Sequence, residues 1–406
     1  MFAVQPLLRE SNYCFVLPKI WSVVFSFQFF MALNMHSILK LALICSFLPT
    51  ISPLSLNYPA VFNFGDSNSD TGGLVAGKAF PLIPPNGETY FLKPSGRFCD
   101  GRLIIDFLME AMELPYLNPY LDSVGSPSFE TGCNFATGGS TILPANAASI
   151  NPFSFNLQLY QFFRFKKRAL ALLSKDKELQ KFLPAEGYFK QGLYMIDIGQ
   201  NDLDTAFYSL KSEENVLALI PQLVSGLEYG MKILYDSGAR NFWIHNTGPL
   251  GCLPRIIATF GKNDNLDELG CVNSHNRAAN VFNMKLHDVC VNFLAQLPEA
   301  NCTYVDIYSM KLSLISTHSL YGFQQPLAAC CGYGGPPLNF DSRIACGLTK
   351  DLNGSIVTAN PCNNTAEYIN WDGNHYTEAA NRFVADLILT GNYSDSPHLA
   401  NAPSLT

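Results

Sequence analysis

The chain has 406 residues, of which 48% are hydrophobic and 15% charged, with a formal net charge of −7. This composition supports a sizeable hydrophobic core and excludes an intrinsically disordered chain. The acidic balance argues against nucleic acid as a partner, because phosphate binding requires a basic surface. A short basic run at residues 164–168 is interpreted as a solvated helix face.

The N-terminal region has the pattern of a secretory signal peptide. From Met35 a charged start leads into an apolar run at residues 41–48, followed by small and polar residues. A second apolar stretch at residues 20–33 precedes it, so translation from Met31 or Met35 and a signal anchor are both open alternatives. Neither run reaches the roughly 20 residues of a spanning helix. We therefore expect cleavage, no stable membrane span, and secretion to the extracellular space or cell wall.

Beyond this leader, short apolar runs alternate with longer helical patterns. Residues 1–55 are assigned to the N-terminal extension and signal peptide, and residues 56–406 to a single domain. Strands are predicted at residues 60–64, 193–198, 241–245 and 304–307. Helices are predicted at residues 155–173, 214–235, 273–296 and 377–389. The alternation predicts an α/β fold with a mostly parallel sheet covered on both faces. Ligands in such sheets bind beyond the carboxyl ends of the strands.

Cysteines and glycosylation sequons agree with export. Two of the twelve cysteines, Cys14 and Cys45, fall in the extension, and the even number that follows is compatible with disulfides. N-glycosylation is predicted at the sequons of Asn301, Asn353, Asn363 and Asn392.

Ser67 lies in the turn Gly65-Asp66-Ser67-Asn68, straight after the first predicted strand. A serine at this place can project its hydroxyl into the ligand crevice, and Gly65 gives the backbone room to turn. The same residue types are typical of any polar turn, and the local sequence alone favours that simpler interpretation.

A serine nucleophile requires an adjacent base and a third group that orients the base. Only two of the seven histidines have a carboxylate three residues upstream: His375 with Asp372, and His398 with Asp395. The second pair lies in a Ser/Pro-rich tail, whereas the first lies at the entrance to the last predicted helix. The three-residue spacing can bring Asp372 to the imidazole Nδ1 and leave Nε2 for the serine. A purely structural pair is the alternative.

Two further segments offer hydrogen-bond donors for a developing oxyanion. The first is Asn134-Phe135-Ala136-Thr137-Gly138-Gly139-Ser140, whose paired glycines can expose a backbone N–H. The second is Gly199-Gln200-Asn201-Asp202, directly after a predicted strand, where Asn201 carries a side-chain amide. A flexible Gly-Gly turn and an ordinary helix cap are the alternative interpretations.

Together these four segments resemble the four sequence blocks of the SGNH hydrolases, and more closely the plant GDSL esterase/lipase family. Two further segments resemble its plant members: Asn246-Thr247-Gly248-Pro249-Leu250-Gly251-Cys252-Leu253-Pro254 and Cys330-Cys331-Gly332-Tyr333-Gly334. The resemblance runs in order from about Tyr58 to Thr390, nearly the whole mature chain.

The resemblance implies a three-layer α/β/α fold and a serine esterase/lipase that hydrolyses carboxylic esters through an acyl-enzyme. In this family pattern Ser67 matches the nucleophile, His375 the general base and Asp372 its orienting group. The implied oxyanion hole combines the Ser67 N–H, the Gly139 N–H and the Asn201 amide. Expected substrates are small-molecule, lipid or acetylated-glycan esters, and no oligomeric state is predicted.

The sequence also limits the chemistry. Asn68 stands where the family motif has Leu, a departure that bears on the pocket rather than on the triad. No cofactor or metal is expected, because H-E-x-x-H is absent and cysteines of a secreted chain favour disulfides. The absence of G-x-S-x-G argues against the α/β-hydrolase fold. The expected disulfides are Cys252–Cys271, two bridges among Cys330, Cys331, Cys346 and Cys362, and, as guesses, Cys99–Cys133 and Cys290–Cys302.

Other functions stay open at this point. An acyltransferase or polymer-acetyl esterase would use the same triad, whereas a non-catalytic lipid- or carbohydrate-binding protein would not need it. A glycosidase would require a suitably spaced carboxylate pair. The aromatic residues Tyr160, Phe162, Phe163 and Phe165 are interpreted as core rather than as the border of an acyl pocket.

Overall fold

The secondary structure is taken from a computed structural model, which describes residues 56–124, 127–144, 151–210, 212–262 and 265–395. The strands are β1 (Val61–Gly65), β2 (Gly132–Asn134), β3 (Leu193–Asp197), β4 (Asn241–His245), β5 (Asn301–Val305), β6 (Gln325–Ala329), β7 (Thr349–Leu352), β8 (Ser355–Thr358) and β9 (Tyr368–Asn370). The α-helices are α3 (Gly73–Lys78), α4 (Ile104–Ala111), α5 (Phe155–Leu173), α6 (Tyr188–Gln191), α7 (Gln200–Leu210), α8 (Glu213–Asp236), α9 (Pro254–Phe260), α10 (Asn273–Gln296), α11 (Ile307–Ser316) and α12 (Glu378–Thr390). Short 3₁₀ helices are η1 (Lys177–Lys181), η2 (Leu250–Cys252), η3 (His318–Tyr321) and η4 (Thr365–Glu367).

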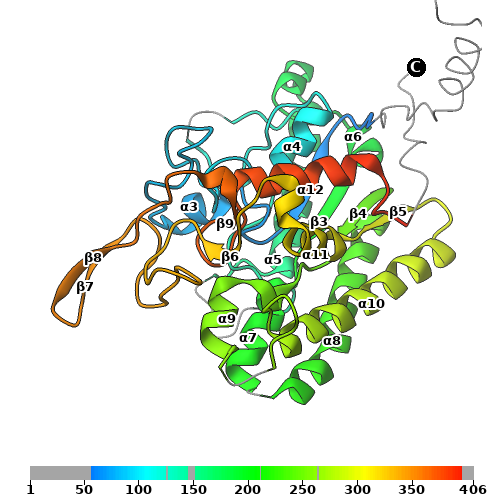
Figure 1. Cartoon of the computed structure of the whole chain (residues 1–406). Helices are drawn as coiled ribbons and strands as arrows, with labels where there is room; N and C mark the ends of the chain where they lie inside the picture. Colours follow the sequence, from blue (N-terminus) through cyan, green and yellow to red (C-terminus); the bar gives the residue numbers. More distant parts are fainter. Residues whose placement is uncertain (1–55, 125–126, 145–150, 211, 263–264, 396–406) are drawn as a thin grey trace, which may run out of the picture. The chain divides into compact units, whose positions relative to one another are not determined.

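Five parallel strands form the central sheet in the order β2-β1-β3-β4-β5, of which β3, β4 and β5 are labelled in Figure 1. After β1 the chain moves to one side of that strand for β2 and then to the other side for β3. Sheets of this order have their topological switch point between the first and third strands, and ligands bind in the crevice at the carboxyl ends there. The segments that follow β1 and β3 are those that carry Ser67 and Asn201.

The two faces of the sheet bury separate hydrophobic clusters because strand side chains alternate. In β1, Phe62 and Phe64 join the cluster formed with α5, α8 and α10, whereas Val61 joins the cluster formed with α4, α11 and α12. The chain is therefore a three-layer α/β/α protein, as predicted. Phe162 and Phe165 of α5 are buried in the first cluster, whereas Tyr160 is 61% exposed.

The predicted elements are largely confirmed. The bounds of α5, α10 and β4 match the predictions, and the final helix begins after Thr377, whose side chain caps it, and ends at Gly391 in the left-handed conformation at φ 74°. The bounds of the strand predicted at residues 304–307 are wrong, because β5 spans Asn301–Val305. It ends at Val305, because the Asp306 carboxylate accepts a hydrogen bond from the Ser309 N–H and starts α11.

An excursion between β6 and β9 leaves the three-layer core. The strands β6 and β9 pair in parallel, and between them the antiparallel hairpin β7–β8 reaches outward (Figure 1). Two disulfides, Cys330–Cys362 and Cys331–Cys346, close this excursion, and a third joins Cys252 to Cys271. The disulfides expected among these six cysteines are confirmed.

The two remaining disulfide predictions are wrong. Cys99 and Cys133 are free, and they belong to hydrophobic clusters on opposite faces of the sheet, where no bridge can reach. Cys290 on α10 and Cys302 on β5 are also free, and their thiols are hydrogen-bonded neighbours in the core. Burial of small apolar thiols accounts for all four.

Several predictions concern residues outside the described part of the chain. These are the signal peptide, the earlier apolar stretch and His398. The division into a leader and one domain stays a prediction. Within the described residues, every helix is too short or too polar to cross a lipid bilayer.

Candidate active site

Three side chains from distant parts of the sequence meet beyond the carboxyl end of β1. The Ser67 Oγ lies 2.8 Å from the His375 Nε2, although 308 positions separate the two residues. The Nδ1 of the same imidazole lies 2.7 Å from the Asp372 Oδ2. The structure thus joins the three residues singled out from the sequence into one continuous hydrogen-bonded chain.

The loop between β9 and α12 holds the imidazole in place. The Asp372 Oδ1 accepts the backbone N–H groups of Asn374 and His375, each at 2.9 Å, so the carboxylate shapes the loop as well as contacting the ring. Gly373 has φ 98°, a conformation that strains any residue with a Cβ, and a Cβ there would collide with Phe340. The Phe98 ring packs against the imidazole of His375, with 5.2 Å between the two ring centres.

Electrostatics favours an ionised Asp372. Its burial would raise the pKa of the carboxyl, but the charge of His375, the hydrogen bond from that ring and the two backbone N–H donors outweigh burial, and the pKa is lowered. The Asp372 side chain is 16% exposed and that of His375 14%. The pair is therefore arranged to keep a negative charge behind the imidazole and Nδ1 protonated.

The nucleophile turn, residues 65–68, is held by hydrogen bonds on both sides of Ser67. Gly65 exchanges two hydrogen bonds with the Gln158 amide of α5, at 3.0 and 2.8 Å. The Asp66 Oδ1 accepts the backbone N–H and side-chain amide of Asn68, both at 2.9 Å. These contacts fix the exit from β1 and leave the Ser67 hydroxyl facing the imidazole.

Two backbone N–H groups, those of Ser67 and Gly139, are without an acceptor among the described residues. The Gly139 segment meets the Ser67 turn through the Thr137 N–H, which donates to the Gly65 carbonyl at 3.2 Å. The neighbouring Gly138 N–H is already donated to the Asp70 Oδ2 at 2.7 Å. The choice of Gly139 over Gly138 as oxyanion donor therefore has a physical reason, since Asp70 occupies the other N–H.

The Asn201 amide reaches the same turn from the first turn of α7. Its Nδ2 donates to the Asp66 Oδ2 at 3.2 Å and to the Ser140 backbone carbonyl at 3.0 Å. The side chain is thus placed between the nucleophile turn and the Gly138-Gly139 segment. Both of its N–H groups have protein acceptors, and a ligand oxygen would have to replace one of them.

Buried charges lie beneath this turn. Burial, and then the charge of Asp66, raises the pKa of Asp197 at the end of β3 to about 7. Burial lowers the pKa of Lys311 on α11 to about 8, although both carboxylates oppose the shift. The Lys311 ammonium also lies 3.9 Å from the centre of the Tyr376 ring. Lys311 is thus a buried cation placed to offset the carboxylates behind Ser67.

Asp202 fastens the segment after Gly139 to α7. Its carboxylate accepts the backbone N–H groups of Ile142 and Leu143, at 2.8 and 3.3 Å. Burial raises the pKa of Asp202 to about 7, although these hydrogen bonds oppose the shift. Next to it, α7, α8 and this segment line an open pocket of about 280 Å³, whose lining is mainly apolar and includes Leu143, Ala206 and Leu219.

The raised pKa of Asp202 leads to a testable dependence of stability on pH. The folded protein binds the proton more tightly than the unfolded chain, whose Asp pKa is near 4, so this group's contribution to stability is present at low pH and is lost as pH rises through about 7. At 1.4 kcal/mol per pKa unit, the loss between pH 5 and pH 8 is about 3 kcal/mol. In urea unfolding, the free energy of unfolding of Asp202→Asn should therefore rise relative to that of wild type by about 3 kcal/mol between pH 5 and pH 8. Parallel pH profiles for the two proteins would contradict this assignment.

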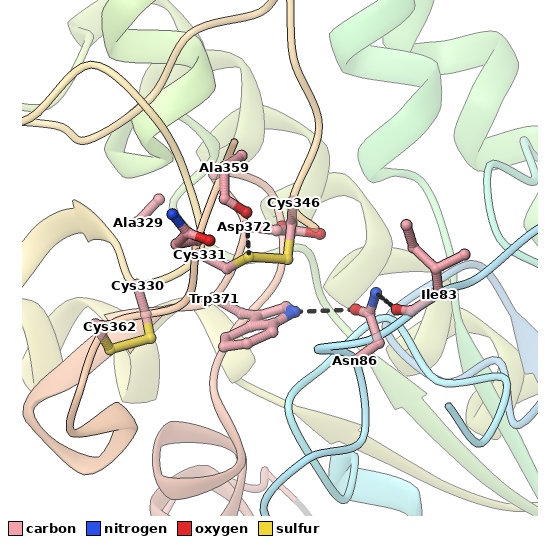
Figure 2. Close-up of a disulfide and its surroundings, with 12 residues drawn as sticks. Ile83, Asn86, Ala329, Cys330, Cys331, Cys346, Ala359, Cys362, Trp371 and Asp372 are labelled. Carbon is pink, nitrogen blue, oxygen red and sulfur yellow. Dashed lines mark hydrogen bonds between the residues drawn. A yellow bond between two sulfur atoms is a disulfide. The ribbon is translucent and has the colours of Figure 1, made fainter. Parts of the chain in front are cut away.

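Two disulfides, Cys330–Cys362 and Cys331–Cys346, lie next to the residues that precede Asp372. The N–H groups of Cys330 and Cys331 donate to the carbonyls of Asn370 and Trp371, at 3.0 and 2.6 Å. Figure 2 shows the Trp371 indole beside the Cys331–Cys346 bridge, with its N–H directed at the Asn86 side chain, 3.0 Å away. The two bridges therefore hold the strand from which the His375 loop departs.

Two residues of the site were missed from the sequence. Asp70 accepts four backbone N–H groups, those of Gly72, Gly73, Leu74 and Gly138, and burial raises its pKa to about 6. It joins the nucleophile segment to the glycine pair. Its position three residues after Ser67 was a usable signal, because a short acidic side chain in a turn accepts nearby N–H groups. Gln158 offered no such signal within a helical pattern.

Comparisons with known proteins show the family of this chain. The family model described as GDSL-like Lipase/Acylhydrolase matches residues 61–388. A GDSL esterase/lipase of Arabidopsis thaliana is 56% identical over 86% of this chain and 92% of its own length, and a second is 53% identical over 90% and 98%. An esterase of Hevea brasiliensis is 44% identical over 90% of this chain and 94% of its own. The matched residues include every side chain of the site described above.

Proposed function

We propose that this chain, which belongs to the GDSL-like lipase/acylhydrolase family, is a secreted serine esterase/lipase that works through Ser67, His375 and Asp372. Its class is that of the carboxylic-ester hydrolases, as the names of its plant relatives indicate. The observation that carries the proposal is the hydrogen-bonded chain with distances of 2.8 and 2.7 Å from serine to imidazole to carboxylate. This is the geometry that turns a weakly nucleophilic hydroxyl into a reactive one.

The first half-reaction acylates the serine. The Ser67 Oγ attacks the ester carbonyl while its proton passes to the His375 Nε2, and Asp372 stabilises the resulting imidazolium. The tetrahedral intermediate collapses when the carbon–oxygen bond to the alcohol breaks and His375 returns the proton to the leaving oxygen. The alcohol departs and the acyl group stays on Ser67.

The oxyanion is stabilised by the Ser67 N–H, the Gly139 N–H and the Asn201 amide. The first two are free among the described residues, and the third would exchange one of its protein acceptors for the oxyanion. The 3.2 Å contact to Asp66 is the longer of the two, and giving it up leaves the Ser140 contact to hold the side chain. Donors that need little reorganisation supply a large share of catalysis in acyl transfer.

In the second half-reaction water replaces the alcohol. The neutral His375 takes a proton from the water, which attacks the acyl carbonyl, and the free acid leaves as Ser67 recovers its proton. The same intermediate would pass its acyl group to an alcohol in an acyltransferase. A pocket of about 280 Å³, lined mainly by apolar groups, lies beside Asp202, the residue after Asn201, and would suit an apolar acyl group.

Export is part of the proposal. Three disulfides are typical of proteins that fold in an oxidising compartment. The four sequon asparagines, Asn301, Asn353, Asn363 and Asn392, are all exposed and so accessible to glycosylation. An extracellular or cell-wall location suits an enzyme that acts on small-molecule, lipid or acetylated-glycan esters.

The experiment that tests the proposal is turnover of a short-chain aryl ester by the secreted protein with and without the Ser67 hydroxyl. Products are analysed in the presence of excess alcohol. A hydrolase yields the free acid, whereas a transferase yields a new ester. Turnover that does not depend on Ser67 would overturn the proposal.

A further inference from the structure

Arg255, the second residue of α9, contacts the His375 loop through both its backbone and its side chain. Its backbone N–H donates to the Gly373 carbonyl at 3.1 Å, and its Nε donates to the Asn374 Oδ1. Gly373 and Asn374 are the two residues between Asp372 and His375. Arg255 therefore contacts the catalytic loop on the short stretch that sets the distance between carboxylate and imidazole.

The other two guanidinium nitrogens bind α7. The Arg255 Nη2 pairs with the Asp204 Oδ2, and its Nη1 donates to the Tyr208 hydroxyl at 2.9 Å. The same helix carries Asn201 in its first turn. One planar guanidinium group thus connects the loop of the general base to the helix of the oxyanion amide.

The pairing is shielded from solvent. The side chains of Arg255 and Asp204 are 22% and 13% exposed, and the Asp204 Oδ1 has no hydrogen-bond partner among the described residues. Burial raises the pKa of Asp204, and the charge of Arg255 only partly offsets that shift. Removing the guanidinium would leave the Asp204 carboxylate buried without a positive partner. Arg255 is therefore the residue that joins α7 to the His375 loop.

The helix that Arg255 binds, α7, also contacts the other segments of the site. Gln200 accepts from the Asn68 amide at 3.5 Å, Asn201 contacts Asp66, and Asp202 holds the segment after Gly139. The contact through Arg255 adds the His375 loop to this set. The first two turns of α7 and Arg255 therefore connect all four chemistry-bearing segments.

We propose that Arg255 is a positioning residue for ester cleavage: it sets the His375 loop relative to the helix of Asn201, so that base and oxyanion donor face Ser67 together. The inference rests on the proposed function. A misplacement of about 1 Å at a catalytic group can cost about 10²-fold in rate. The effect should appear in kcat, because the residue acts on reacting groups rather than on substrate affinity.

The test compares Arg255→Met with a matched control, Arg240→Met. The Arg240 side chain is 21% exposed, pairs with Glu299 at 3.0 Å and donates to two backbone carbonyls, but it lies at the amino end of β4, away from the site. We expect Arg255→Met to lower kcat per titrated active site by about 10- to 100-fold with KM changed by less than about threefold. Arg240→Met should keep kcat within about twofold. The melting temperature of each variant reports folding.

A second pair of variants separates positioning from loss of folded protein. If Arg255 acts through Asn374, the double variant Arg255→Met/Asn374→Ala should lose little more kcat than the worse single variant. Arg255→Lys, which keeps the charge but not the three-way contact, should fall between Met and wild type. A kcat for Arg255→Met within about threefold of the control, or losses that multiply in the double variant, would overturn the positioning role. Ester turnover that survives Ser67→Ala would instead overturn the proposed function.

Discussion

Replacement of Ser67 by alanine should lower turnover of a short-chain aryl ester by a factor of about 10⁵ or more, with little change in folding. The hydroxyl is the group that forms the covalent bond, and among the described residues no other hydroxyl takes part in the hydrogen-bonded chain with His375 and Asp372. Residual activity would come from the oxyanion donors and substrate binding alone. The measurement is kcat by absorbance of the released phenol, with the melting temperature as the test of folding.

Ser69→Ala is the matched control. Ser69 lies in the same turn and is buried, but its Oγ has no hydrogen-bond partner among the described residues. Its loss should leave kcat within a few-fold of wild type. Equal loss of activity in both variants would mean that the turn, not the Ser67 hydroxyl, is what the reaction requires.

Asp372→Asn should lower kcat by about 10³- to 10⁴-fold while the loop keeps its shape. The asparagine Oδ1 can still accept the N–H groups that Asp372 accepts from Asn374 and His375. Its amide, however, would donate to the imidazole Nδ1 and force the ring proton onto Nε2. In that tautomer His375 cannot take the proton of Ser67.

Asp395→Asn provides the comparison for this variant. Asp395 pairs with the His287 Nε2 at 3.0 Å and accepts the Tyr304 N–H of β5 at 3.1 Å, so it lies at the β5 edge of the sheet, whereas Ser67 follows β1. It is also the carboxylate of the rival Asp–His spacing in the sequence. Its replacement should leave kcat unchanged, and a loss equal to that of Asp372→Asn would contradict the assignment of the orienting carboxylate.

The fold was accessible from the sequence where local patterns decide structure. The amphipathic period of α5 and α10 gave their bounds, and the helix predicted at residues 377–389 differs from α12 by one residue at each end. The strand β2 was missed because three residues, Gly132–Asn134, are too few to show an alternating pattern. The free cysteines were missed because the face of the sheet on which each thiol lies depends on tertiary structure.

The site was accessible only in part. Asp372 and His375 were candidates by their spacing, whereas the local sequence of Ser67 favoured a polar turn, and the resemblance of four ordered segments to a known family assigned all three roles. The structure brings the three side chains together. Asp70 and Arg255 act through contacts to residues 68 and 119 positions away, at Gly138 and Asn374. The turn position of Asp70 was a local signal for its nearby N–H contacts, but no local pattern encodes the contact to Gly138 or that of Arg255 to Asn374, which become visible only when the segments are placed side by side.

The most direct measurement is the site at which a fluorophosphonate reacts with the native protein, read by peptide mass spectrometry. The central claim is that His375 activates one hydroxyl, so a single adduct is expected on the peptide that contains Ser67, and it should be absent after prior denaturation. An adduct on a different serine, or no reaction with a folded protein that still hydrolyses esters, would contradict the claim.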